Sequence, residues 1–164
     1  MNYTIRPYRS GEEQYVAGAH RRIYTEEYRW GESFTYYAAQ IALTFPTRGK
    51  CPEEELWVAE LDGQLVGSIL LCRTEEAGTG QLRLFLVEKA HRNSGIGTAL
   101  TEALLTRARA VGYRRLILWS ADPLHDALRH YEKLGFVYEE AVDNHDWSLE
   151  GKVVKEIKMS LTLE

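Results

Sequence analysis

The residues best suited to chemistry stand where a helical pattern begins, in the stretch AHRNSGIGTALTEALL from Ala90 to Leu105. Arg92, Gly95 and Gly97 come directly before a run whose apolar spacing predicts an amphipathic helix. The start of a helix carries unpaired backbone N–H groups and the positive end of the helix dipole, so it attracts anions. Glycine has no side chain to keep an anion away from the backbone. The stretch therefore predicts a phosphate-binding corner.

Two common nucleotide motifs do not fit this corner. The P-loop pattern GxxxxGK[ST] needs a lysine after its second glycine, and no lysine stands at that distance. The dinucleotide pattern GxGxxG fails at its third glycine, where Leu100 stands, and the preceding strand does not open a βαβαβ array. What remains is the pattern RxxGxG, formed by the residues from Arg92 to Gly97.

A second segment follows at a characteristic distance, after one more predicted strand. Tyr131 to Phe136 reads YEKLGF and ends another amphipathic helix. RxxGxG followed by Y-x-x-x-G-F resembles the GNAT superfamily of N-acetyltransferases, and the resemblance spans nearly the whole chain. More narrowly, HRRIYTEEYRWGESF and LRLFLVE resemble the GNAT module fused behind MarR-type winged-helix regulators. The chain has no room for a DNA-binding half, so we expect the acetyltransferase module to stand alone.

The resemblance implies that acetyl-CoA is the co-substrate and that backbone N–H groups hold its pyrophosphate. These groups belong to Arg92, Asn93, Ser94, Gly95, Ile96, Gly97 and Thr98. The Arg92 side chain is implied to add positive charge beside them. The strand containing Leu84–Val87 is implied to diverge from its neighbour at a bulge. The backbone groups of Leu86 and Val87 then bind the pantetheine arm and polarise the thioester carbonyl, while their side chains belong to the core.

The resemblance also implies that Tyr131 is the acid that protonates the leaving thiol. A thiol pKa of about 8.5 and a phenol pKa of about 10 are close enough for useful proton transfer. The alternative is a core position, because Tyr131 shares a predicted helix face with Leu124, Leu128 and Leu134.

The amine that receives the acetyl group needs a base or a water relay, because an alkylamine with a pKa of about 10.4 is mostly protonated at neutral pH. Glu88, at the end of the predicted central strand, is the first candidate. Glu26 and Glu27 come next, since the aromatic-rich region Ile23–Phe45 corresponds to where GNAT substrates bind. The aromatic side chains of this region form either a substrate pocket or part of the core.

The elements that are expected to hold these residues alternate between strands and helices. Asp62-Gly63 between two apolar runs predicts a tight hairpin turn. Helices are expected after residues 10–11 and over 34–43, 96–110 and 124–134. Strands are expected over 3–8, 56–61, 65–72, 81–88 and 115–119, from 136, and over 153–163. The order predicts one domain, 1–164, of the α/β (α+β) class. Its sheet is mixed, mostly antiparallel and of about seven strands, with helices on both faces, as in the GNAT fold.

Composition limits the remaining function classes. The 164 residues are 45% hydrophobic and 27% charged with a net charge of -4, so nucleic acid is not an expected partner. Apolar runs are too short for a membrane span and no signal peptide is expected. Cys51 and Cys72 suit reduced thiols in the cytoplasm. His125 and His130 are five apart and do not share a helix face, so no metal site is expected.

The sequence thus predicts an acetyl-CoA-dependent N-acetyltransferase that acts on a primary amine of a small molecule or a peptide by direct attack. One alternative is a CoA-binding sensor or scaffold without turnover, and another is an enzyme that uses a longer acyl-CoA. Monomer and homodimer are both compatible with the sequence.

The sequence departs from the GNAT pattern at one point. Many GNAT proteins have a coenzyme-contacting asparagine where Ser120–Leu124 reads SADPL. Ser120, Asp122 or water would have to replace it.

Overall fold

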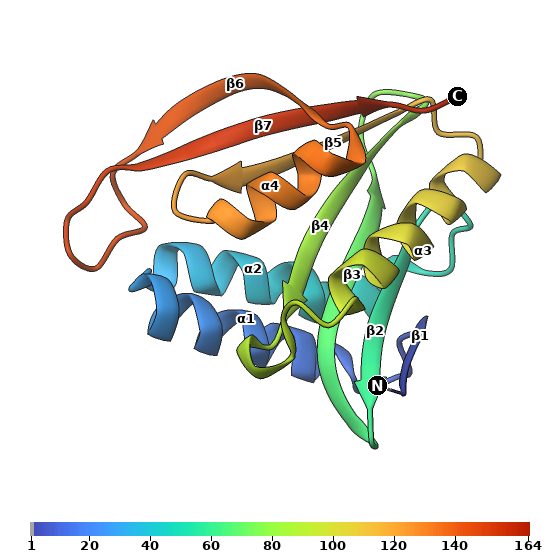
Figure 1. The fold of residues 1–164 in the computed structure, drawn as a ribbon, viewed down its shortest axis with the longest axis horizontal. Helices are drawn as coiled ribbons and strands as arrows, with labels where there is room; N and C mark the ends of the chain where they lie inside the picture. Colours follow the sequence, from blue (N-terminus) through green and yellow to red (C-terminus); the bar gives the residue numbers. More distant parts are fainter. Residues whose placement is uncertain (1) are drawn as a thin grey trace.

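Seven strands form one sheet in the order β1-β2-β3-β4-β5-β7-β6 (Figure 1). The computed structural model describes residues 2–164. Its strands are β1 (Tyr3–Pro7), β2 (Glu55–Leu61), β3 (Gln64–Arg73), β4 (Thr79–Val87), β5 (Arg115–Ala121), β6 (Val137–Asn144) and β7 (Val154–Thr162). Its helices are α1 (Glu13–Tyr28), α2 (Glu32–Thr44), α3 (Ile96–Ala110) and α4 (His125–Leu134), with short 3-10 turns at Phe45–Arg48 and Lys89–His91.

The pairing of the strands confirms the predicted mixed sheet. Neighbouring strands are antiparallel except for β4 and β5, which are parallel and joined by the crossover helix α3. The long strand β4 is the fourth of the seven and therefore lies at the centre, as its apolar sequence indicates.

Helices cover both faces of the sheet, and β3 shows how the sequence produces this arrangement. Ile69 and Leu71 pack in the cluster that contains α3 residues, whereas Leu70 and Cys72 pack in the cluster that contains α1 and α2 residues. Successive strand side chains point to opposite faces, so an unbroken apolar strand requires a helix layer on each side.

Several local signals are confirmed at the positions where the sequence shows them. Asp62 and Gly63 connect β2 to β3 with φ values of 50° and 78°, as a tight hairpin turn requires. Helix α3 spans Ile96–Ala110, as predicted. Helix α4 begins one residue later than predicted, at His125, and Gly135 ends it in the left-handed region with φ 102°.

The sheet opens between β4 and β5, and this opening positions the site. These two strands pair only over Thr79–Gln81, after which β5 continues beside β7 while β4 diverges (Figure 1). A bulge in β4 accompanies the divergence, because Leu84 and Phe85 together lie opposite the single residue Ile69 of β3.

The bulge is held in a backbone conformation that a bulky residue rarely adopts. Leu84 has φ 52°, and the buried Ser68 hydroxyl donates a hydrogen bond of 2.7 Å to its carbonyl. The bulge and the divergence that the GNAT resemblance implies are therefore present.

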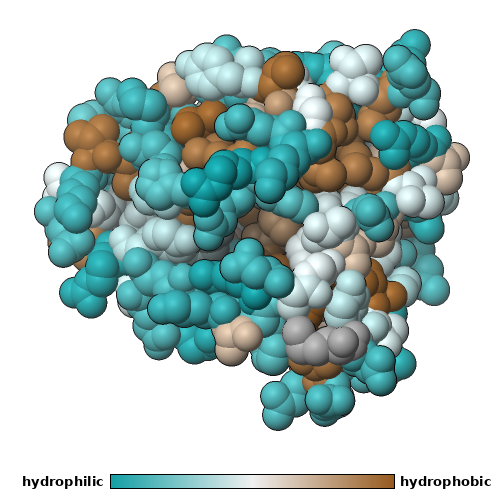
Figure 2. Space-filling view, in the orientation of Figure 1, coloured by the Kyte–Doolittle hydropathy of each residue, from teal (hydrophilic) through white to brown (hydrophobic). Residues whose placement is uncertain are grey.

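The surface of the molecule is hydrophilic over most of the view in Figure 2, with apolar atoms at the floor of a hollow near its middle. Within residues 2–164, no helix is both long and apolar enough to cross a bilayer.

Candidate active site

The first cavity, which we call the glycine cavity, has a volume of about 480 Å³ and lies at the start of α3. Helix α1, strand β4 and the start of α4 form its other walls. Its lining includes Tyr28, Val87, Arg92, Gly95, Gly97 and Thr98. The predicted phosphate-binding corner therefore borders a space large enough for a ligand.

The corner has the backbone geometry that an anion site needs. Gly95 precedes α3 with φ 90°, and Asn93 is also left-handed with φ 61°. No side chain caps the helix, and no acidic residue stands in its first turn. The first N–H groups of α3 are consequently available to a ligand.

The side chains of the corner are used within the protein. Ile96 is fully buried, and the Ser94 hydroxyl donates to the His91 carbonyl. A Cβ atom on Gly97 would lie 3.3 Å from the Phe85 ring, so a side chain here would crowd the wall of the cavity. Ser94 and Ile96 do not line the glycine cavity, whereas Asn93, Gly95, Gly97 and Thr98 do.

Arg92 occupies the cavity wall but its charge is balanced. Its guanidinium donates to both carboxylate oxygens of Glu27 at 2.7 and 2.9 Å, and its Nε donates to the Val87 carbonyl at 2.9 Å. The hydrogen bonds to Glu27 raise the pKa of Arg92. Arg92 therefore ties the corner to α1 and β4, and it contributes less free positive charge than the sequence suggests.

Strand β4 presents the two residues whose backbones are expected to bind the pantetheine arm. The Leu86 side chain is 5% exposed and packs against Ala19 and Ile23 of α1, whereas Val87 is half-buried; both residues line the glycine cavity. Because β4 has left β5 at this level, the backbone edge on that side has no strand partner.

The second cavity, which we call the aromatic cavity, has a volume of about 290 Å³. Its aromatic lining comes from elements far apart in the sequence and consists of Tyr24, Trp30, Phe34, Tyr37, Phe85, Trp119, Tyr131 and Trp147. The two cavities share Tyr24, Phe85, Leu124 and Ala127, so they meet where β4 and β5 diverge. The same four residues therefore form a common wall of the two cavities.

Tyr131 lines the aromatic cavity near this junction. It is 5% exposed and packs against Phe85 and Phe136, with both ring centroids 5.9 Å away. None of the hydrogen bonds among residues 2–164 involves its hydroxyl. Burial, and then the nearby Tyr24 phenol, raise the pKa of Tyr131, so its hydroxyl stays protonated and can donate a hydrogen bond. The ring of Tyr131 thus belongs to the core, and its hydroxyl has no hydrogen-bond partner within residues 2–164.

Glu88 does not lie where a base for the amine should lie. Its carboxylate accepts hydrogen bonds from the Tyr15 hydroxyl at 2.7 Å and from the Arg22 guanidinium at 3.1 and 2.8 Å. Burial would raise the pKa of Glu88, but the hydrogen bonds from Arg22 and Tyr15 outweigh it, and the pKa is lowered. Glu88 lines neither cavity. The role of Glu88 as the base stays a prediction, and these contacts show only that its carboxylate is already engaged by Tyr15 and Arg22.

The other two candidate bases, Glu26 and Glu27, also lie outside the aromatic cavity. Glu27 is the partner of Arg92, and Glu26 is exposed on α1. Glu156 of β7 does line this cavity, and the Asn144 amide donates a hydrogen bond of 3.1 Å to it.

Sequence reasoning gave no role to His20, Arg83 and Glu156, which line the aromatic cavity, and it considered Ser120 only as a replacement for the coenzyme-contacting asparagine. The available signal for His20 was its place on an apolar helix face, four residues after Val16 and three before Ile23. The available signal for Arg83 was its charge within the otherwise apolar run of β4. Nothing in the local pattern distinguishes Glu156.

The segment after β5, which lacks the asparagine of many GNAT proteins, is partly engaged elsewhere. Asp122 accepts the backbone N–H of Lys155 at 3.0 Å, so it holds β7 in place. Pro123 and Leu124 line the glycine cavity with apolar atoms. In the part of the chain that the structure describes, no three His, Cys, Asp or Glu side chains lie close enough to hold a metal ion.

The sheet is open between β4 and β5, with the uncapped start of α3 beside one cavity and Tyr131 beside the other, as the resemblance to GNAT acetyltransferases implies. The family model of the Acetyltransferase (GNAT) family matches residues 18–136, and the chain belongs to this family.

Three known proteins show how far the similarity extends. The chain is 37% identical over 84 residues to N-acetyltransferase family 8 member 2 of Rattus norvegicus, a match that covers 49% of this chain and 37% of that protein. It is 32% identical over 96 residues to N-acetylaspartate synthetase of Xenopus tropicalis, a match that covers 58% of this chain and 35% of that protein. The match thus spans little more than a third of either relative.

The fold also matches a putative acetyltransferase from Salmonella typhimurium whose structure contains its cofactor acetyl-CoA. The TM-score is 0.77 at 18% identity, over 100% of this chain and 95% of that chain. At this level of sequence identity, the similarity shows that the two proteins share a fold.

Proposed function

We propose that the protein is an N-acetyltransferase that transfers an acetyl group from acetyl-CoA to a primary amine by direct attack. The observation that carries the proposal is the junction of the two cavities at the opening between β4 and β5. Membership in the GNAT family and the acetyl-CoA in the Salmonella typhimurium protein support it.

The residues of the glycine cavity fit acetyl-CoA. The uncapped N–H groups at the start of α3 bind the pyrophosphate, and the absence of side chains at Gly95 and Gly97 lets it approach. Arg92 holds the corner in place through Glu27. The unpaired edge of β4 at Leu86 and Val87 binds the pantetheine arm and directs N–H groups at the thioester carbonyl.

Acetyl-CoA supplies a thioester whose carbonyl carbon the amine attacks, so that a C–N bond forms and the C–S bond breaks. The Tyr131 hydroxyl donates its proton to the leaving thiolate. Glu156, the carboxylate that lines the aromatic cavity, takes the proton that the amine loses, directly or through water. This assignment replaces Glu88.

Several predictions from the sequence stay predictions, among them the single domain 1–164 and the roles of the individual site residues. The resemblance to modules fused to MarR-type regulators, the cytoplasmic location, and the choice between monomer and homodimer also stay predictions.

The proposal is tested by measuring thiol release from acetyl-CoA over a panel of amines, amino acids and peptides, for the protein and for Tyr131→Phe. We expect kcat of the variant to fall by about 100-fold, the usual lower range for general acid catalysis, with KM for acetyl-CoA within about twofold. Tyr138→Phe is the matched control, because Tyr138 is 63% exposed on β6 and lines neither cavity.

The outcomes separate the alternatives. An unchanged kcat in Tyr131→Phe removes the role of this residue. Thermal stabilisation by CoA without thiol release from any amine supports the sensor alternative. If no CoA ester stabilises the protein, the proposal as a whole is wrong.

A further inference from the structure

Two buried polar atoms lack any hydrogen-bond partner among residues 2–164: Nε2 of His20 and the hydroxyl oxygen of Ser120. Both residues line the aromatic cavity, one from α1 and the other from β5. A buried polar group without a partner costs about 1–3 kcal/mol, so two of them at one cavity call for a ligand that pairs with them.

The hydrogen bonding of His20 defines what its free nitrogen can do. Its Nδ1 lies 2.7 Å from the Val16 carbonyl, which can only accept, so Nδ1 carries the proton and Nε2 carries a lone pair. The ring is 2% exposed and stacks on Tyr24 at 5.9 Å between ring centroids. Burial lowers the pKa of His20 to about 4, which keeps Nε2 unprotonated at neutral pH. This nitrogen therefore seeks an N–H or O–H donor.

Arg83 brings a positive charge to the same cavity. Its guanidinium donates to the Tyr37 hydroxyl and lies 5.7 Å from the centroid of that ring. No carboxylate of residues 2–164 forms an ion pair with it, unlike Arg22 and Arg92. A guanidinium with free donors at a cavity wall matches a carboxylate.

The other charge at the aromatic cavity is the Glu156 carboxylate, whose hydrogen-bond partner is the neutral Asn144 amide. The lining thus contains one cation and one anion, each without an ion-pair partner in the described chain. A zwitterion complements both. The aromatic walls suit an apolar side chain, and a volume of about 290 Å³ lies at the lower end for ligand cavities, so a small molecule fits better than a peptide.

From these contacts we infer that the acceptor is a small zwitterionic amino carboxylate with an apolar or aromatic side chain. Arg83 binds its carboxylate, and its amino group donates a hydrogen bond to Nε2 of His20. The inference rests on the proposed function, since it names the substrate class of that site.

The inference is tested with pairs of acceptors that differ only in the carboxylate, such as phenylalanine and phenethylamine, in the thiol-release assay. Arg83→Gln should raise KM for phenylalanine by about 10- to 100-fold, the value of a hydrogen bond to a charged group. KM for phenethylamine and for acetyl-CoA should stay within about twofold. Arg109→Gln is the matched control, because Arg109 is exposed on α3 and lines neither cavity.

Two variants of His20 separate binding from packing. His20→Asn keeps a donor for the Val16 carbonyl but loses the acceptor at Nε2, whereas His20→Gln places an amide oxygen near Nε2. We expect His20→Asn to raise KM for phenylalanine by about tenfold, the value of one hydrogen bond, and His20→Gln to restore part of it. A purely structural histidine would give equal losses in both variants, and these would follow the melting temperature.

The outcomes distinguish this inference from the proposed function. If amines without a carboxylate are acetylated as well as amino carboxylates, or if Arg83→Gln affects both acceptors alike, the inference is wrong while the acetyltransferase stands. If thiol is released with other amines but with no amino carboxylate, the inference is again wrong. If no CoA ester binds, the proposed function fails first.

Discussion

At the scale of single residues, His20 departs furthest from its ordinary behaviour. Most histidines titrate near neutral pH, whereas burial lowers the pKa of His20 from 6.5 to about 4. The hydrogen bond to the Val16 carbonyl acts in the opposite direction and only partly offsets the burial. The protein therefore keeps a neutral imidazole with one free lone pair inside its substrate-side cavity.

We predict that His20 makes the folded protein less stable as the pH falls from about 6.5 to about 4. In this window the unfolded chain binds a proton at His20 that the folded protein does not bind, while above it both forms are neutral. The free energy of unfolding should then fall by up to about 1.4 kcal/mol per pH unit from this residue. Urea unfolding at several pH values should give a shallower slope for His20→Gln. Identical slopes would show that His20 is not buried neutral.

Arg92 and Glu88 illustrate a different lesson at the same scale. Both have the residue type that a role in acetyl transfer requires, and both are engaged by charged partners from α1. A side chain whose charge is already paired within the protein binds an additional ligand or proton less strongly. Residue type is therefore necessary for a catalytic role, but the partner decides whether the role is available.

At the scale of elements, the start of α3 and the bulge of β4 create the coenzyme side of the site. Gly95 and Leu84 both have positive φ, at 90° and 52°. At Gly95 the conformation is inexpensive because glycine has no Cβ, whereas at Leu84 it is strained and held by Ser68. The backbone conformation of the corner thus follows from the glycine in the sequence, whereas that of the bulge depends on tertiary contacts such as the Ser68 hydrogen bond.

We predict that Gly95→Ala destabilises the protein by about 1–2 kcal/mol, because a left-handed backbone strains any residue with a Cβ. The new Cβ would also lie 3.2 Å from the Tyr3 hydroxyl. The dissociation constant for CoA should rise, since the N–H groups of the corner shift. Calorimetric titration and denaturant unfolding check both effects.

Gly18→Ala is the matched control for this prediction. Gly18 lies within α1, and a Cβ there would meet nothing within 4 Å. This variant should be more stable by about 0.5–1 kcal/mol and bind CoA normally. Equal effects of the two substitutions would contradict the role given to Gly95.

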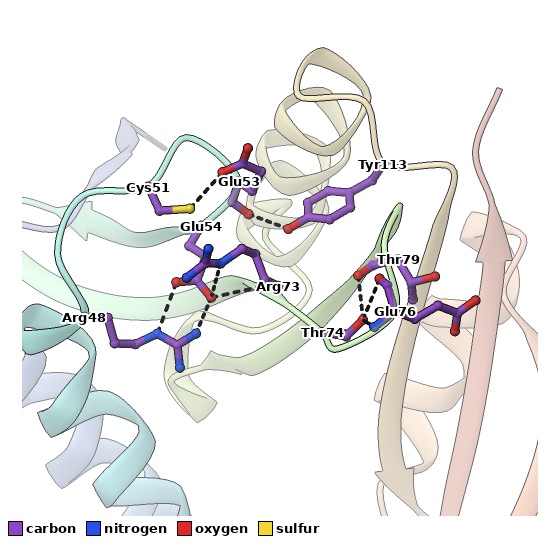
Figure 3. A network of polar contacts seen from close by, with 9 residues as sticks. All are labelled: Arg48, Cys51, Glu53, Glu54, Arg73, Thr74, Glu76, Thr79 and Tyr113. Carbon is purple, nitrogen blue, oxygen red and sulfur yellow. Dashed lines mark hydrogen bonds and ion pairs between the residues drawn. The ribbon is translucent and has the colours of Figure 1, made fainter.

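At the scale of the whole molecule, a polar network joins segments that are distant in the sequence (Figure 3). The buried Glu54 carboxylate accepts hydrogen bonds from the Arg48 guanidinium and from the backbone N–H of Arg73. The Tyr113 hydroxyl, beyond α3, donates to the Glu53 carbonyl at 2.8 Å. The network joins the connection between α2 and β2 to Arg73 of β3 and to Tyr113, which follows α3.

We predict that Glu54→Gln lowers the free energy of unfolding by about 2 kcal/mol, the value of hydrogen bonds to a buried charge whose partners stay partly in water. Acetyl transfer by the variant should be unchanged below its melting transition, because Glu54 lines neither cavity. Glu75→Gln, at an exposed position, is the control. A stability loss equal in both variants would contradict the network.

Much of the fold followed from patterns of neighbouring residues. The Asp62-Gly63 hairpin, the limits of α3 and the central place of β4 were predicted because turn geometry, capping and apolar runs are local properties. The left-handed glycine corner before α3 was predicted for the same reason, since it is a run of consecutive residues.

The substrate side depended on pairings that the local pattern does not contain. Arg22 lies 66 residues from Glu88 and Glu27 lies 65 residues from Arg92, yet these ion pairs decide which charges are free. His20, Arg83, Ser120 and Glu156 meet at one cavity only because the sheet opens between β4 and β5. The sequence by itself determined the glycine corner before α3, because a backbone conformation depends on adjacent residues. Only the tertiary structure decided which side chains line the aromatic cavity, because burial and charge pairing depend on residues brought together by folding.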